Sequence, residues 1–184
     1  MHAILGASAN CIAVNPSDMA VALAMLDATV QVTGQHGSRS IPILEFHRLP
    51  GDTPNIDNNL KPDELITSVD LPALAVANHS SYVKIRDRSS YAFALVSVAA
   101  ALTVENGSVK DVRMALGGVA HKPWRVPAVE KTLIGKPANQ ETFKDAANQI
   151  LGGAVPREHN GFKVELANRA IVLSLLDLAS GGTI

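Results

Sequence analysis

Cysteine is almost absent from this chain of 184 residues, whose only thiol is Cys11. A single thiol excludes a disulfide within the chain, and it excludes any iron–sulfur or zinc site that takes several cysteine ligands from it. Aromatic residues are also scarce at 4%, yet 47% of the residues are hydrophobic. That fraction is ample for a packed core in one large or two small domains. The sequence therefore predicts a folded protein without internal cross-links.

Basic residues are not in excess, because 16 lysines and arginines face 17 acidic residues and the net charge is -1. Binding to a nucleic-acid backbone requires a concentrated basic stripe, whereas the basic residues here are scattered. The chain also lacks an apolar run of about 18 residues and a positively charged leader before an apolar segment. We therefore expect no nucleic-acid partner, no membrane span and no signal peptide in this sequence.

The chain begins with an apolar segment that has no polar lead-in. Residues 2–14 look strand-like and contain four small residues, which are Gly6, Ala7, Ser8 and Ala9. Small residues allow a ligand or another chain segment to come close, and the pattern favours both interpretations equally. Because such a beginning resembles the middle of a domain, we expect the chain to be the C-terminal part of a longer protein.

The first half predicts a short helix and three strands. Ser17 or Asp18 is expected to cap a helix that runs through MAVALAMLDA, because Pro16 blocks helix formation before them. Strands are expected at 29–33, 39–44 and 65–71. Pro42 marks the second of these as an edge strand, since proline cannot donate a backbone hydrogen bond.

The polar loop between the second and third of these strands contains His47 and Arg48. It has no pair of metal ligands at a regular spacing, so it does not indicate a metal site. A catalytic role for His47 remains open, although a lone histidine beside an arginine is more often structural.

The second half predicts an antiparallel meander followed by helices. Strands are expected at 82–87, 93–104 and 108–117, and Asn106-Gly107 predicts a hairpin between the last two. Helices are expected at 127–133, 141–151 and 164–179. The last helix is apolar over more than half of its circumference, so the sheet must cover it. The change of pattern divides the chain into residues 1–72 and 80–184, with a linker at 73–80.

A cationic row precedes the most hydrophobic segment of the chain, in residues 81–102 (SYVKIRDRSSYAFALVSVAAAL). Lys84, Arg86 and Arg88 occupy every second position, so a strand that extends to Arg88 would place them on one face. Such a row can bind an anion or polarise a carbonyl group. The alternative is a solvated strand edge, on which lysine discourages pairing between sheets, and charge runs are more often of this kind.

Four motifs occur in order along nearly the whole chain: SANCIAVNPSDM, PDELITSVDLP, SYVKIRDRSSYAFALVSVAAAL and MALGGVAHKPWR. Together they resemble the flavin subunit of the molybdenum hydroxylases, the xanthine dehydrogenase and carbon monoxide dehydrogenase family, and most closely the FAD-binding subunits of bacterial aldehyde oxidoreductases. The resemblance implies an α+β fold. Residues 1–72 would form the second half of a PCMH-type FAD-binding domain. Residues 80–184 would form a CO-dehydrogenase-flavoprotein C-terminal-like domain, a three-stranded antiparallel sheet with helices.

The resemblance also implies which residues contact FAD. Ser8-Ala9-Asn10 matches a Gly-Gly-Asn turn beside the phosphates and ribityl chain, with both glycines replaced. Asp18 matches the acidic residue of a Ser-Asp pair. Ile66 matches an aliphatic residue that packs on the isoalloxazine ring, and Lys84 matches a lysine that approaches this ring. An ammonium group there stabilises negative charge on the reduced ring and so tunes its potential.

The implied function is that of an FAD-binding electron-transfer subunit in a molybdenum-containing oxidoreductase of the aldehyde or xanthine type. Electrons would pass from a molybdenum centre through iron–sulfur clusters to FAD and then to an external acceptor. The implied partners are a large subunit with the molybdenum cofactor and a small 2Fe-2S subunit, so these groups would lie on partner chains or upstream. The compartment would be the cytoplasm, or the periplasm if a partner subunit carries an export signal.

Two further expectations concern the isolated chain. The glycine-rich loop with which this family binds the FAD pyrophosphate is not in the sequence, so we expect the chain alone to bind FAD weakly or not at all and to be inactive. A hypothesis from a different class is an interaction or scaffold module that docks on partner subunits without a cofactor. A flavin absorption spectrum of the protein purified with its neighbours distinguishes the two.

Overall fold

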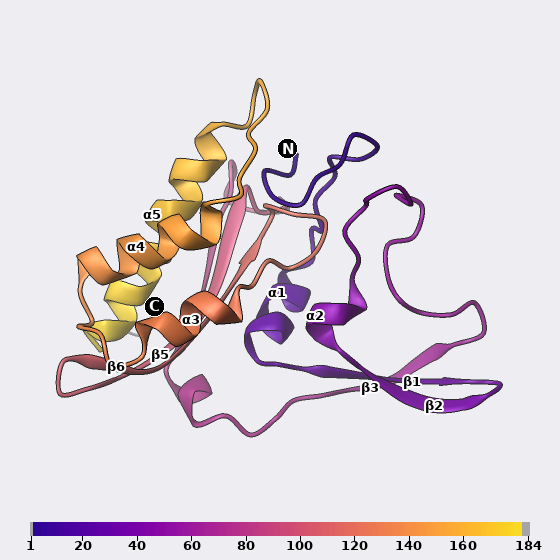
Figure 1. Cartoon of the computed structure of the whole chain (residues 1–184), viewed down its shortest axis with the longest axis horizontal. Helices are drawn as coiled ribbons and strands as arrows, with labels where there is room; N and C mark the ends of the chain where they lie inside the picture. Colours follow the sequence, from indigo (N-terminus) through magenta and orange to yellow (C-terminus); the bar gives the residue numbers. More distant parts are fainter. Residues whose placement is uncertain (1, 182–184) are drawn as a thin grey trace.

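Two three-stranded antiparallel sheets organise the computed structural model, which describes residues 2–181 (Figure 1). The first sheet has the order β2–β1–β3, with β1 at Thr29–Gly34, β2 at Gly37–Pro42 and β3 at Leu65–Asp70. The second has the order β4–β5–β6, with β4 at Ser80–Ile85, β5 at Val96–Glu105 and β6 at Ser108–Gly117. The expected α+β class is thus confirmed.

Two helices share a hydrophobic core with the first sheet. Helix α1 spans Asp18–Met25, and the short helix α2 spans Ile43–Phe46 directly after β2. The cap of α1 is Ser17, whose hydroxyl oxygen accepts a hydrogen bond from the amide of Ala20 at 3.1 Å. The outer strand β2 ends at Pro42, which confirms the expected edge position.

The second sheet is covered on both faces, by α3 (Pro127–Leu133), α4 (Gln140–Leu151) and α5 (Phe162–Ala179) on one side and α1 on the other (Figure 1). Along β5, Val98 belongs to the core beneath the long helices, whereas its neighbour Ala99 belongs to the core beneath α1. Successive side chains of a strand point to opposite faces, so a doubly covered strand is apolar at nearly every position. This explains the run VSVAAAL. None of the helices in the described part of the chain is both long and apolar enough to cross a membrane.

The N-terminal segment departs from its prediction, because residues 2–14 form bends and loops instead of a strand. The amides of Ile4 and Leu5 both donate to the carbonyl of Val119, and the amide of Val155 donates to Ile4. Ile4 and Leu5 are also buried in the core of the second sheet. The segment therefore finds its partners far along the chain and has no neighbouring strand.

Three smaller expectations also need correction. Strand β4 ends at Ile85, so Arg86 and Arg88 lie in the following loop and the one-sided cationic row does not form. The expected linker at 73–80 contains a short 3-10 helix, η1 (Ala75–Asn78). The strand expected at 39–44 gives way to α2 after Pro42. The division at 72 and 80 separates the two sheets, but α1 and the N-terminal segment contact the second sheet, so the domain boundary stays a prediction.

Candidate functional site

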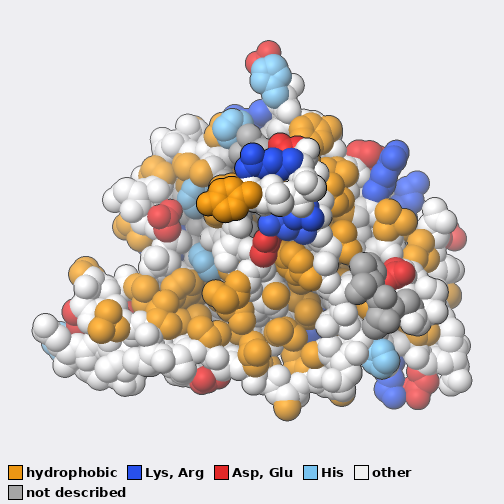
Figure 2. Space-filling view, turned by 180° about the vertical axis from the view of Figure 1, so that it is seen from behind, with side chains coloured by type: hydrophobic (Ala, Val, Ile, Leu, Met, Phe, Trp, Pro, Cys, Tyr) orange, Lys and Arg blue, Asp and Glu red, His pale blue; other side chains and the backbone are white. Residues whose placement is uncertain are grey.

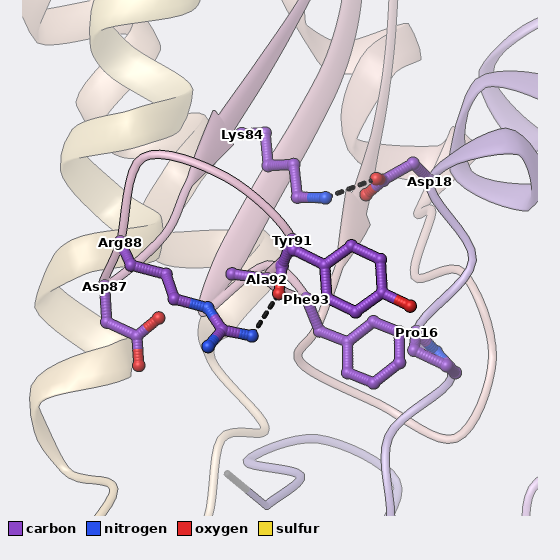
Figure 3. A pocket seen from close by; sticks show the side chains of 8 residues that line it. All are labelled: Pro16, Asp18, Lys84, Asp87, Arg88, Tyr91, Ala92 and Phe93. Atoms are coloured by element: carbon purple, nitrogen blue, oxygen red, sulfur yellow. Dashed lines mark hydrogen bonds and ion pairs between the residues drawn. The ribbon is translucent and has the colours of Figure 1, made fainter.

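A cavity of about 730 Å³ opens between the start of α1 and the loop after β4 (Figure 3). It combines charged side chains with aromatic and apolar ones, and its lining residues are Pro16, Asp18, Lys84, Asp87, Arg88, Tyr91, Ala92 and Phe93. A pocket with apolar walls and a few convergent polar groups is the usual form of a site for a small organic ligand. Two predicted cofactor residues, Asp18 and Lys84, are among these eight.

An ion pair joins the two predicted residues at the edge of the cavity. Lys84 Nζ lies 2.7 Å from Asp18 Oδ2, and Figure 3 shows the lysine extending from the sheet toward the carboxylate. Asp18 is the first residue of α1, where a carboxylate interacts favourably with the helix dipole. Both side chains remain partly exposed, at 26% for Lys84 and 40% for Asp18, so a ligand in the cavity can reach them.

Tyr82 completes this network, and the sequence analysis did not identify it as a site residue. Its hydroxyl donates to Asp18 Oδ1 at 2.9 Å and lies 3.0 Å from the hydroxyl of Ser97. Burial raises the pKa of Tyr82, and the adjacent Asp18 carboxylate raises it further, so the phenol stays protonated as a donor. A signal was present in the sequence: Tyr82 precedes Lys84 by two positions in a strand and therefore shares its face.

Two glycines form the wall behind Asp18. A methyl group on Gly117 would lie 2.3 Å from Ser97 Oγ and 2.6 Å from Val21 Cγ2, so a side chain there is excluded. Gly118 has a φ of 72° and packs against the backbone carbonyl of Leu95. Only glycine adopts this conformation at low cost with a carbonyl so close. The two glycines of the motif MALGGVAH thus allow the end of β6 to pack closely against Ser97 and α1, next to Asp18.

Two aromatic rings form the outer rim of the cavity. Tyr91 is 96% exposed and Phe93 is 63% exposed, and Figure 3 shows their rings near Pro16. Arg88 donates a hydrogen bond to the carbonyl of Tyr91 within the same loop. Figure 2 shows a projecting ring among basic side chains, next to a broad hydrophobic area. Exposed aromatic rings at a cavity mouth offer flat surfaces for a planar ligand.

The other predicted cofactor residues lie outside this cavity. Ser8 Oγ accepts hydrogen bonds from the amides of Asn10 and Cys11, at 3.1 and 3.3 Å, and so closes a small turn. Asn10 Nδ2 donates to the carbonyl of Gly51 at 3.1 Å, and Ala9 is exposed at the tip. The structure therefore does not bring Ser8-Ala9-Asn10 to Lys84.

Ile66 lies on β3, a strand whose six residues are all exposed. It pairs with Val32 of β1, so it continues the sheet face on which Val32 is buried. Half of its side chain is accessible, at 50%. Ile66 therefore presents an apolar surface to solvent, as a residue that packs on a ligand must, but it is not part of the wall around Lys84 and Asp18.

His47 shows no catalytic arrangement in the structure. Its ring meets Phe46 edge to face at 5.0 Å between centroids, and burial together with the nearby Lys122 ammonium lowers its pKa. Within residues 2–181 no cluster of three histidine, cysteine or acidic side chains is arranged to hold a metal ion. The role of His47 is therefore best described as packing beside the loop.

Comparison with known protein families identifies both halves of the chain. Residues 7–74 match the FAD binding domain in molybdopterin dehydrogenase, and residues 81–177 match the CO dehydrogenase flavoprotein C-terminal domain. Among curated relatives, the aldehyde oxidoreductase FAD-binding subunit of Escherichia coli K12 is 44% identical over 96% of this chain and 52% of its own length. The glyceraldehyde dehydrogenase medium chain of Sulfolobus acidocaldarius is 36% identical over 79% of this chain and 50% of its own.

Solved structures show the same fold at lower identity. A chain of quinoline 2-oxidoreductase from Pseudomonas putida 86 superposes on all of this chain and 59% of its own length, with a TM-score of 0.74 and 24% identity. A chain of reconstituted CO dehydrogenase from Oligotropha carboxidovorans gives a TM-score of 0.76 at 18% identity, over 88% of this chain and 56% of its own. The chain thus spans about half the length of the curated relatives and solved chains that it matches.

Proposed function

The chain belongs to the FAD-binding flavoprotein family of the molybdenum hydroxylases, and from this premise we propose that it holds FAD for electron transfer in an aldehyde-oxidising enzyme. The observation that carries the proposal is the network of Tyr82, Asp18 and Lys84 at the edge of the 730 Å³ cavity. Two of these residues, Asp18 and Lys84, were expected to contact FAD from the family resemblance. Their meeting across 66 positions in the chain is a property of the fold.

The residues around the cavity fit a flavin ring. Its walls include the apolar Pro16 and the aromatic Phe93 and Tyr91, which suit a flat heteroaromatic ring. One ammonium group and one carboxylate lie at its edge, where they can bind polar atoms on the rim of such a ring. FAD, when bound, supplies the exchange of two electrons with the enzyme's redox centres and with an external acceptor.

Each residue of the network has a distinct role in this proposal. Lys84 places a positive charge where the ring becomes more negative on reduction, so it raises the redox potential of the bound flavin. Asp18 moderates that charge and holds the ammonium in place. Tyr82 fixes the carboxylate, because it occupies Oδ1 and leaves Oδ2 for the lysine. None of these groups has to gain or lose a proton, so they act on the cofactor's potential and position.

The remaining contacts with FAD are proposed for residues that lie outside the cavity. Ser8-Ala9-Asn10 is proposed to contact the phosphates or ribityl chain, since it is an exposed turn outside the ring cavity. Ile66 is proposed to pack on the ring from β3. The proposed partners are a subunit with the molybdenum cofactor and a 2Fe-2S subunit. We retain the proposal that the chain alone binds FAD weakly, because it spans about half of its relatives.

The test is co-purification of the chain with the other subunits of its complex, followed by a flavin absorption spectrum. The complex is expected to carry FAD, and Lys84→Ala is expected to shift the flavin potential. Lys144→Ala, at an exposed lysine of α4, is the matched control and should leave the potential unchanged. An intact complex without flavin would refute the proposal and favour an interaction module that docks on its partners without cofactor.

A further inference from the structure

A lysine without an acidic partner is buried at the start of α5. The side chain of Lys163 is fully buried, at 0% exposure, and its ammonium donates hydrogen bonds to the carbonyls of His2 and Gly118. Within residues 2–181 no carboxylate forms an ion pair with it. Its position in the first turn of a helix is also electrostatically unfavourable for a cation.

This arrangement costs stability. Burial without a counter-ion penalises the charged form, and it lowers the pKa of Lys163 to about 8. A hydrophobic side chain of similar length would avoid this penalty. The ammonium is therefore better explained by what its hydrogen bonds hold in place than by a contribution to global stability.

The two carbonyls belong to segments that form one unit with the predicted cofactor turn. Residues 3–12 form a closed loop, because the amide of Ala3 donates to the carbonyl of Ile12 at 2.8 Å. This loop lies along residues 118–121: Val119 accepts from Ile4 and Leu5, and Ala120 accepts from Asn15. Lys163 bonds to both segments at one place, because His2 directly precedes the loop of residues 3–12 and Gly118 is the first residue of the segment 118–121.

Asn160, in the connection before α5, also donates hydrogen bonds to the backbone at the start of the N-terminal loop. It is 4% exposed, and its Nδ2 donates to the carbonyls of His2 and Ala3 at 3.2 Å each. Its Oδ1 accepts from the amide of Arg157, which fixes the side-chain orientation. Two buried donors thus converge on the backbone just before Ser8-Ala9-Asn10. Figure 1 shows the N-terminal segment beside the connection that leads from α4 to α5.

We propose that Lys163 is a positioning residue, whose ammonium clamps the loop of residues 3–12 onto residues 118–121 and so sets the Ser8–Asn10 turn for cofactor binding. The cofactor part of this inference rests on the proposed function. Gly118 also directly follows Gly117, and both glycines lie beside Asp18 on the side away from the 730 Å³ cavity. A C-terminal helix therefore controls the geometry of a turn in the N-terminal segment.

The first measurement is amide hydrogen exchange of the 184-residue chain without cofactor, comparing wild type with Lys163→Met. Methionine keeps the length and apolar character of the stem but donates no hydrogen bond. The amides of Ile4, Leu5 and Ser8 are expected to exchange at least about tenfold faster, because hydrogen bonds to a charged donor are worth more than a factor of ten. Arg169→Met, at an exposed cation on the same helix, is the control and should change none of them.

Global stability separates a clamp from a general structural role. If Lys163 acts as a clamp, the urea concentration at the midpoint of unfolding at pH 7 is expected to stay unchanged or to rise in Lys163→Met, because the variant removes the buried charge. If Lys163→Met does not fold, Asn160→Leu removes the neighbouring amide donor without adding a charge beside Lys163 and is expected to accelerate the same amides. Unchanged exchange in the folded variants would overturn the clamp.

The second measurement is FAD affinity of the chain assembled with its partner subunits. Lys163→Met is expected to weaken binding by about tenfold, while Arg169→Met has no effect. An altered exchange rate with unchanged affinity would overturn the role in cofactor binding. Failure of the proposed function is distinguishable, since it would show as absence of FAD from the wild-type complex, whatever the exchange data.

Discussion

The hydroxyl of Tyr82 donates a hydrogen bond to Asp18 Oδ1 at 2.9 Å, although 64 positions separate the two residues in the chain. A phenol has one proton, and a carboxylate attracts it more strongly than the neighbouring hydroxyl of Ser97 does. Ser97 is 1% exposed and lies beside the Gly117 wall. The orientation of the Asp18 carboxylate at the cavity is therefore set from inside the second sheet. The two halves of the chain meet at this hydrogen bond.

The protonation state of Tyr82 provides the first prediction. Because burial and the Asp18 carboxylate raise its pKa, part of the phenolate absorbance of this two-tyrosine chain should appear only well beyond the usual value of about 10. Ultraviolet difference titration of the folded protein measures this absorbance. Tyr82→Phe should lack the late-titrating part. A late part that persists in Tyr82→Phe would contradict the burial of this phenol.

The Lys84–Asp18 pair predicts opposite shifts of the flavin potential in the assembled enzyme. Lys84→Ala removes a positive charge and leaves Asp18 unpaired, so the potential should fall, whereas Asp18→Asn should raise it. A charge about 4 Å away at an effective dielectric of about 20 interacts by roughly 4 kcal/mol before solvent screening. A quarter of this energy corresponds to a shift of about 20 mV for a two-electron couple. Redox titration of the flavin absorbance measures both variants.

The sign of these two shifts is the discriminating result. Equal potentials in wild type, Lys84→Ala and Asp18→Asn would mean that the pair is a solvated strand-edge feature. Shifts of the same sign would point to a general disturbance of the site instead of an electrostatic effect. Tyr82→Phe, which changes no formal charge, serves as the control for a loss of order at Asp18.

The parts of the fold that sequence patterns predicted well are those whose interactions are local. Strand β6 was expected at 108–117 and is observed at Ser108–Gly117, because Asn106-Gly107 fixes the hairpin before it. Helix α3 agrees equally well with its prediction, since Pro127 marks its first residue. In both cases the signal and the structure it determines lie within a few residues of each other.

The sequence-based predictions were wrong where segments distant in the chain supply the hydrogen-bond partners. Residues 2–14 have the apolar composition of a strand, but Val119 and Val155 take up their hydrogen bonds, and no periodicity reveals this. The strand around Lys84 was expected to reach residue 87, yet the amide of Leu95 bonds to the carbonyl of Ile85 and closes a loop there. Tyr82 was missed although its position two residues before Lys84 places both on one strand face, since only the fold reveals that Asp18 is their common partner.

Gly117 provides a prediction about the wall of the site. Gly117→Ala would place a methyl group 2.3 Å from Ser97 Oγ and 2.6 Å from Val21 Cγ2, so the hydroxyl or α1 must shift. Overpacking of this kind typically costs about 1–3 kcal/mol of unfolding free energy. Gly153→Ala is the matched control, because a methyl group there has no neighbour within 4 Å. Urea unfolding measures both, and equal stability of the two variants would show that the wall is not tightly packed.

The lowered pKa of Lys163 predicts how the free energy of unfolding changes with pH. Its pKa is about 8 in the folded chain, against 10.5 for an unperturbed lysine. Between these values the unfolded chain binds a proton that the folded chain does not, so the contribution of Lys163 to stability rises with pH across this window and is lost as the pH falls through 8. The rise is at most about 3.5 kcal/mol, since one pKa unit corresponds to about 1.4 kcal/mol.

The comparison with Lys163→Met isolates this contribution. The pKa of Lys122 is also lowered by burial and therefore contributes with the same sign in wild type and variant alike. Urea unfolding at intervals from pH 7 to 10.5 should show the wild type gaining stability relative to Lys163→Met as the pH rises. A difference between the two proteins that stays constant with pH would mean that Lys163 remains charged throughout. In that case the His2 and Gly118 carbonyls would offset its burial, and the clamp would be a stabilising contact.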